Sequence, residues 1–182
     1  MSAVGLSASA ALVVVFAVAA GGKVRSAAMF GTFAEALGQF GVPASRRRAV
    51  AAAVVAGELL VICWLVLPVV PAVVRLGPAV AVLAWFSLAI VLASRRHATL
   101  ACHCFGSGGH TPVGPHLAVN AALIILGSAG VLSPTPATSA GARVLAIGLG
   151  IIVGAAALSA IPVLEAIGPR SSSRPAALPE RI

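Results

Sequence analysis

Hydrophobic residues form long unbroken runs along most of this chain instead of alternating with polar ones. Strands of a membrane β-barrel would alternate apolar and polar positions over about ten residues. Continuous runs such as "VLAWFSLAIVLA" favour helices, whose backbone hydrogen bonds are satisfied within the segment. Five runs are close to the roughly 20 residues that a spanning helix needs. They are Ala3–Ala20, Ala49–Val70, Leu76–Ala93, Val113–Leu132 and Val144–Val163.

These runs predict an all-α fold, a polytopic transmembrane helix bundle with a four-helix core and a fifth C-terminal span. We expect residues 1–132 to form the bundle. Residues 133–163 would supply an exposed loop and the extra transmembrane helix, and residues 164–182 a disordered polar tail rich in Pro and Ser. The first run is expected to be a retained helix and not a cleaved signal, because Lys23 and Arg25 follow it and no basic residue precedes it.

Composition supports the lipid bilayer as the main partner. Hydrophobic residues make up 60% of the 182 residues and charged residues only 9%, whereas a soluble domain carries about 25% charged residues. The net charge of +8 does not indicate nucleic-acid binding, because aromatic residues are only 4% and the basic residues form no continuous stripe. Nothing in the pattern requires a cofactor, and none is expected.

The basic residues predict how the chain is oriented in the cell membrane. With the N-terminus outside, ten of the twelve Lys and Arg residues fall on the side that holds the C-terminus, leaving only Arg75 and Arg143 on the other. An excess of Lys and Arg marks the cytoplasmic side. We therefore expect the N-terminus outside, the C-terminus in the cytoplasm, and the loop after the third span at the cytoplasmic face.

The polar segment between the first two spans, residues 23–48, carries a partial helical repeat of apolar residues. The repeat suggests a short amphipathic helix on the membrane surface, and an ordered connecting loop is the alternative. Its members are Met29, Phe30, Phe33, Leu37 and Phe40.

The loop after the third span contains the strongest candidate chemistry, a Cys-x-Cys pair. Cys102 and Cys104 are separated only by His103 in a polar, Gly-rich stretch. A disulfide across one residue is strained, and strain makes such a bond labile and suited to exchange. Neighbouring His103, Arg95 and Arg96 favour the reactive thiolate.

Two other interpretations of this loop stay open. The two cysteines can stand together by chance in an apolar chain that has three. The pair can also bind Cu(I) or Zn(II) together with His103 and His110, and with His97 or His116, although the cysteine spacing is not that of a standard zinc site.

Glu58 is the second candidate, an acidic residue about a third of the way along the second span. A carboxylate at that depth is costly unless it is protonated, paired or hydrated, and no Lys or Arg stands at an adjacent helical position. It is either a functional acid facing the bundle interior or a neutral structural residue. We expect Cys63, Trp64 and Trp85 to pack within the bundle, and Asn120 to hydrogen-bond between helices.

In order along the chain, these residues resemble the MauE family of methylamine-utilisation membrane proteins, which are distantly similar to DoxX-type bundles. The resemblance covers roughly residues 5–130. It rests on Gly22-Lys23, Phe30 and Phe33, Gly57-Glu58-Leu59, Cys102-His103-Cys104-Phe105-Gly106 and Asn120. Two positions depart from the family's usual pattern, namely Val119 where a basic residue is common and His103 where a small residue is common.

The resemblance implies a thiol–disulfide carrier or assembly factor that supports maturation of exported disulfide-containing proteins, as in methylamine utilisation. Cys102 and Cys104 would exchange electrons with a thioredoxin-like partner protein, and Glu58 completes the expected site. One alternative is a DoxX-like, quinone-linked oxidoreductase bundle in which Glu58 and not the thiols is essential. The other is a structural or metal-handling membrane subunit.

Overall fold

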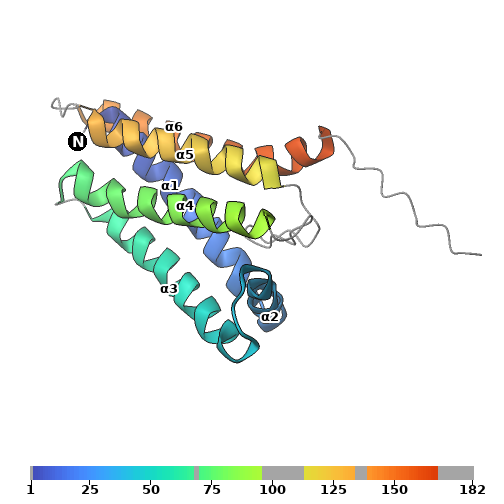
Figure 1. Cartoon of the computed structure of the whole chain (residues 1–182). Helices are drawn as coiled ribbons and strands as arrows, with labels where there is room; N and C mark the ends of the chain where they lie inside the picture. Colours follow the sequence, from blue (N-terminus) through green and yellow to red (C-terminus); the bar gives the residue numbers. More distant parts are fainter. Residues whose placement is uncertain (1, 68–69, 96–112, 134–138, 168–182) are drawn as a thin grey trace, which may run out of the picture.

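The computed structural model describes residues 2–67, 70–95, 113–133 and 139–167, and within these ranges the regular elements are helical. Five long helices lie side by side, and a short helical segment lies across one end (Figure 1). The helices are α1 (Ala3–Val24), α2 (Ala27–Ala36), η1 (Leu37–Phe40), η2 (Ala44–Arg46), α3 (Arg47–Val66), α4 (Ala72–Ser94), α5 (Val113–Leu132) and α6 (Ala140–Ile167).

The prediction of a transmembrane helix bundle is confirmed. Each of the five predicted runs coincides, wholly or for most of its length, with a helix that is long and apolar enough to cross a membrane, namely α1, α3 with the preceding η2, α4, α5 and α6. These helices expose many large apolar side chains, among them Leu60, Trp85, Ile125 and Ile152. Soluble proteins rarely expose so much apolar surface. In a bilayer these side chains face lipid.

Helix ends differ from the predicted boundaries for identifiable reasons. Helix α1 continues past Ala20 to Val24, so that Lys23 belongs to its last turn. Helix α3 stops at Val66 and not at Val70, because Leu67, which precedes Pro68, is extended. Helix α4 begins directly after Pro71 and therefore contains Arg75, which the sequence assigned to the flank of this span.

The core forms where α1, α3, α4 and α5 meet. Phe16, Leu12, Leu76 and Leu123 are its largest fully buried side chains, together with Val15 and His116. Small residues permit close helix contacts, as expected for a membrane bundle. A Cβ added at Gly130 of α5 would lie 2.8 Å from Leu76 Cδ1 of α4, so these helices meet closely at this glycine.

Helix α6 packs along α1 in the same direction (Figure 1). Gly150 and Gly154 face α1, and a Cβ at Gly154 would lie 2.8 Å from the carbonyl oxygen of Ala11. The hydroxyl of Ser7 donates a hydrogen bond of 2.7 Å to the carbonyl oxygen of Ala146. The fifth span is therefore joined to the bundle by direct backbone contact.

The segment between α1 and α3 is helical, as one of its two interpretations predicted. The Ser26 side chain caps α2 by accepting a hydrogen bond from the Met29 amide. Phe33 and Leu37 are buried, and they cluster with Ala51 of α3. The apolar face of this segment therefore packs against the bundle. Gly41, in the left-handed region at φ 83°, ends η1 and lets the chain turn back toward α3.

Candidate functional site

A buried ion pair joins the end of α1 to the middle of α3. The Lys23 ammonium nitrogen lies 2.7 Å from Glu58 Oε1, and the two side chains are only 3% and 2% exposed. Lys23 also donates a hydrogen bond of 3.2 Å to the carbonyl oxygen of Ala19 in its own helix. Its nitrogen lies 5.3 Å from the ring centre of Phe33, within range of a cation–π interaction.

This pair explains how Glu58 is tolerated inside a spanning helix. A carboxylate in this position must be protonated, paired or hydrated, and the structure shows it paired. The partner comes from another helix, so it does not stand among the neighbouring positions of α3 at which the sequence shows no Lys or Arg. Lys23 is correspondingly not a solvated flanking charge, since it is buried.

The second oxygen of Glu58 is in a different situation. Glu58 Oε2 is buried and accepts no hydrogen bond from the residues that the structure describes. Buried polar atoms are usually hydrogen-bonded. One oxygen of this carboxylate is thus held by Lys23, and the other is available to a further donor.

Lys23 and Glu58 line a cavity of about 360 Å³ whose other lining residues come from α1, the segment from α2 to Val42, α3, α4 and α5. Most of the wall is apolar, and two further polar side chains, His116 and Asn120, come from α5. Both are buried. The four polar groups belong to three helices that the packing of the bundle brings together.

Asn120 fulfils its expected role in helix packing. Its side-chain nitrogen donates a hydrogen bond of 3.2 Å to the Ser87 hydroxyl of α4, and that hydroxyl donates to the Leu83 carbonyl oxygen at 2.8 Å. The amide is thereby fixed at the cavity wall. The sequence identified Asn120 for packing, but it did not predict that the residue lines a cavity with Glu58.

In a comparison with protein-family models, residues 1–133 match the family described as methylamine utilisation protein MauE. The chain belongs to the MauE family. The match covers most of the chain and ends just after α5, before α6 begins. Comparisons with curated proteins and with solved structures give no match.

The MauE match and the five apolar helices identify a multi-pass membrane protein of the methylamine-utilisation type. Of the three residues predicted to form its site, only Glu58 falls within the part that the structure describes. Cys102 and Cys104 lie outside the described residues, as do His97, His103 and His110. The thiol exchange and metal-binding interpretations of that loop therefore stay predictions.

The helices on either side of the Cys102–Cys104 loop are nevertheless defined. Helix α4 ends at Ser94, and α5 begins at Val113, both at the end of the bundle where α1 ends and α2 lies (Figure 1). Phe40 of η1 packs in a cluster with Ile90 and Val113 of these two helices. The loop thus begins and ends close to the segment that covers the cavity.

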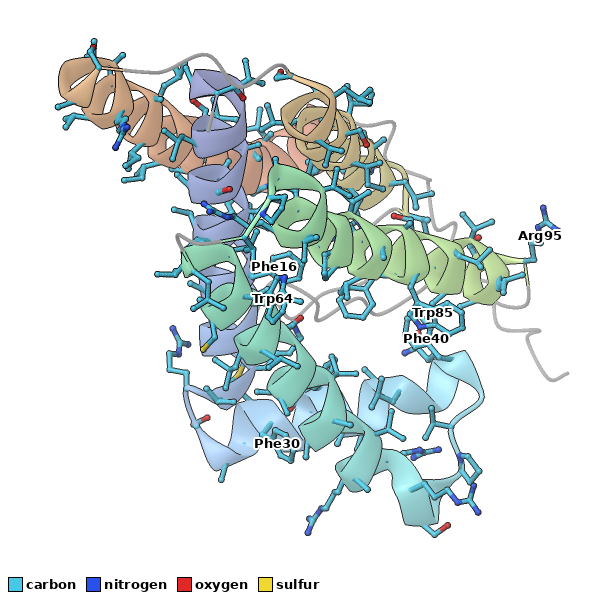
Figure 2. All side chains as sticks on the ribbon, turned by 90° about the vertical axis from the view of Figure 1, so that its left-hand side faces the viewer. Phe16, Phe30, Phe40, Trp64, Trp85 and Arg95 are labelled. Carbon is cyan, nitrogen blue, oxygen red and sulfur yellow. The ribbon has the colours of Figure 1, made fainter. Side chains whose placement is uncertain are left out.

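Two other expectations were wrong. Cys63 does not pack inside the bundle but is exposed on α3. Trp85 is 68% exposed on α4, so it is not packed in the core, and Figure 2 shows it beside Phe40. Trp64 is partly buried and donates a hydrogen bond of 2.7 Å to the Val74 carbonyl oxygen, thereby joining α3 to α4.

Proposed function

We propose that this MauE-family protein is a membrane thiol–disulfide carrier or assembly factor that supports maturation of exported disulfide-containing proteins. Cys102 and Cys104 would be the exchanging thiols. The observation that carries the proposal is this Cys-x-Cys pair in a polar, Gly-rich connection between two spans of a MauE-family bundle.

The exchange is a two-electron reaction with a thioredoxin-like partner protein. A thiolate of the reduced pair attacks one sulfur of the partner disulfide, forming a mixed disulfide and releasing one partner thiolate. The second cysteine then attacks the sulfur of the first, which closes the Cys102–Cys104 disulfide and releases the second partner thiolate. Two protons and two electrons have then passed to the partner. The reverse sequence oxidises the partner.

The surrounding charges support this chemistry. His103 stands between the cysteines, and Arg95 and Arg96 precede them in the sequence. Positive charge stabilises the thiolate over the thiol and so raises the fraction of the reactive species. Arg95 is exposed at the end of α4, where it extends away from the bundle (Figure 2).

The test is thiol alkylation in native membranes, followed by mass measurement, before and after reduction. We expect two additional alkylations that appear only after reduction. In Cys102→Ser or Cys104→Ser the disulfide of the pair cannot form, so both of these alkylations should disappear and the one remaining cysteine should be alkylated without reduction. A Cys63→Ala background removes the exposed cysteine of α3, so that every remaining alkylation belongs to the pair. Thiols that are free before reduction under all growth conditions would contradict the proposal.

Activity provides a second, independent measurement. Cys102→Ser and Cys104→Ser should each abolish disulfide formation in an exported client protein, whereas Cys63→Ala should leave it unchanged. A Cys102→Ser variant with undiminished activity would exclude the exchange mechanism.

A further inference from the structure

The cavity beside Lys23 and Glu58 has an unusual share of the chain's aromatic side chains. The chain has six Phe, two Trp and no Tyr, and five of these residues line this one cavity. They are Phe16, Phe33, Phe40, Trp85 and Phe86. Aromatic walls favour a flat ring, because offset-stacked and edge-to-face contacts add to the burial of apolar surface.

The polar groups at the cavity indicate the chemistry of the ligand's head. The Lys23 ammonium and the Glu58 carboxylate neutralise each other at 2.7 Å, so a head group with net charge would be left without a counter-charge in an apolar site. Glu58 Oε2 accepts no hydrogen bond from the described residues, so it can accept one from a hydroxyl group. The side-chain amide of Asn120 on α5, which is fixed by its hydrogen bond to Ser87, adds a further polar group to the cavity wall.

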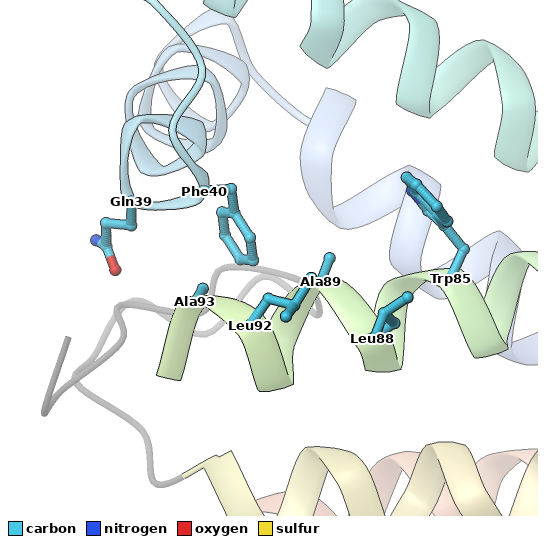
Figure 3. Close-up of a pocket in the computed structure, with 7 residues that line it drawn as sticks. All are labelled: Gln39, Phe40, Trp85, Leu88, Ala89, Leu92 and Ala93. Atoms are coloured by element: carbon cyan, nitrogen blue, oxygen red, sulfur yellow. The ribbon is translucent and has the colours of Figure 1, made fainter. Parts of the chain in front are cut away.

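A second hollow adjoins this cavity beside α4. It measures about 220 Å³ and lies between η1 and α4. Phe40, Trp85 and Ala89 line both hollows, which therefore adjoin. Figure 3 shows Phe40 reaching toward α4 near Ala89 and Leu92, with Trp85 farther along the same helix.

The outer hollow faces the bilayer. Trp85, Leu88 and Leu92 are 68%, 50% and 49% exposed on a helix that is apolar enough to cross the membrane. A molecule that enters between Phe40 and Trp85 therefore comes from the lipid phase. This route selects lipid-soluble ligands and excludes those that need water around them.

We infer that the cavity binds a neutral, lipid-soluble molecule of the quinone or quinol class, whose ring carries carbonyl or hydroxyl oxygens. The ring lies among the aromatic walls, and the apolar tail leaves between Phe40 and Trp85. In the quinol form, one ring hydroxyl donates a hydrogen bond to Glu58 Oε2. This inference rests on the described residues of the cavity alone and is independent of the thiol exchange.

Fluorescence titration of the full chain in lipid nanodiscs tests the inference. Decylubiquinone is the probe, because quinones quench tryptophan emission, and a Trp64→Phe background leaves Trp85 as the reporter. We expect saturable quenching, and we expect the hydroquinone of the same probe to compete. Quenching that rises linearly without saturation, as for simple partitioning into lipid, would overturn the inference.

Matched substitutions on α4 then locate the site. Ala89 lines both hollows, whereas Ala84 is exposed on the same helix and lines neither. Ala89→Phe should weaken probe binding by about tenfold or more, equivalent to about 1.4 kcal/mol. Ala84→Phe should leave binding unchanged while carrying the same added volume. Equal effects of the two substitutions would contradict binding in the cavity.

Glu58→Gln tests the polar end of the site. This variant keeps the side-chain size but replaces the carboxylate acceptor, so it should weaken the hydroquinone more than the quinone. If it does not fold, the Ala89 and Ala84 pair still decides the question.

Discussion

Removing one member of the Lys23–Glu58 pair should destabilise the bundle far more than removing both. At an effective dielectric constant of about 20, unit charges 2.7 Å apart attract each other by about 6 kcal/mol. Desolvation of the two buried groups offsets most of this attraction. Loss of one partner leaves the other charge buried without compensation, which costs about 3–5 kcal/mol.

The assay is a double-mutant cycle with Lys23→Met, Glu58→Met and the combined variant. Methionine keeps an unbranched side chain of similar length in both positions. We expect each single variant to lower the free energy of unfolding, measured by detergent titration of helicity in mixed micelles, by about 3–5 kcal/mol. The combined variant should recover most of the loss, because an apolar pair can replace a buried ion pair with little net change.

The exposed pair of Glu35 and Arg47 supplies the control. Glu35 is 75% exposed, so Glu35→Gln should change the free energy of unfolding by less than about 1 kcal/mol. The reasoning is refuted if the combined variant is no more stable than either single variant. That result would mean that Lys23 and Glu58 contribute independently, through packing of their own side chains.

Three further outcomes are expected. Gly150→Ala should lower the free energy of unfolding, measured by detergent titration, by about 1–3 kcal/mol because the added methyl group pushes α6 off the backbone of α1. Gly148→Ala has open space around it and should not destabilise the protein in the same assay. Asn120→Ala should cost only about 0.6 kcal/mol in the same assay, because its partner hydroxyl on α4 keeps a second hydrogen bond. If the Arg-rich end of the bundle is cytoplasmic, an impermeant maleimide applied to intact cells should label Ser139→Cys and not Ser45→Cys, each in a background without native cysteines. The reverse labelling pattern would mean that the predicted orientation is inverted.

The fold was predictable because a bilayer imposes a simple rule on sequence. Each span must be apolar over its length and satisfy its own backbone, so hydropathy alone locates all five long helices. Helix ends were less predictable, because they depend on single residues such as Pro68, which stops α3 early. The prediction that Trp85 packs within the bundle was also wrong, because a tryptophan inside a span can face either lipid or the core.

The candidate site was predictable only in part, for a physical reason. Glu58 stands out as the one acidic residue within the predicted spans, but its partner is distant in sequence and lies on another helix. A signal was present. Lys23 is the only lysine of the chain and follows the first span closely, and a buried carboxylate needs a cation. Charge balance inside the bilayer could therefore have suggested this pair, whereas no sequence rule indicated the cavity beside it.

Stability alone does not account for a Lys–Glu pair in this position. An apolar pair of similar volume would hold α1 and α3 together about as well, without the risk of an uncompensated charge. A cavity of about 360 Å³ next to the pair also forgoes packing contacts that a filled core would make. The empty space is unfavourable, and it becomes favourable when a quinol ring fills it and a ring hydroxyl donates a hydrogen bond to Glu58 Oε2. Ligand binding should then raise the free energy of unfolding in proportion to the logarithm of probe concentration above its dissociation constant. Decylubiquinone that stabilises the Ala84→Phe protein but not the Ala89→Phe protein would show that the same cavity is the source of that stabilisation.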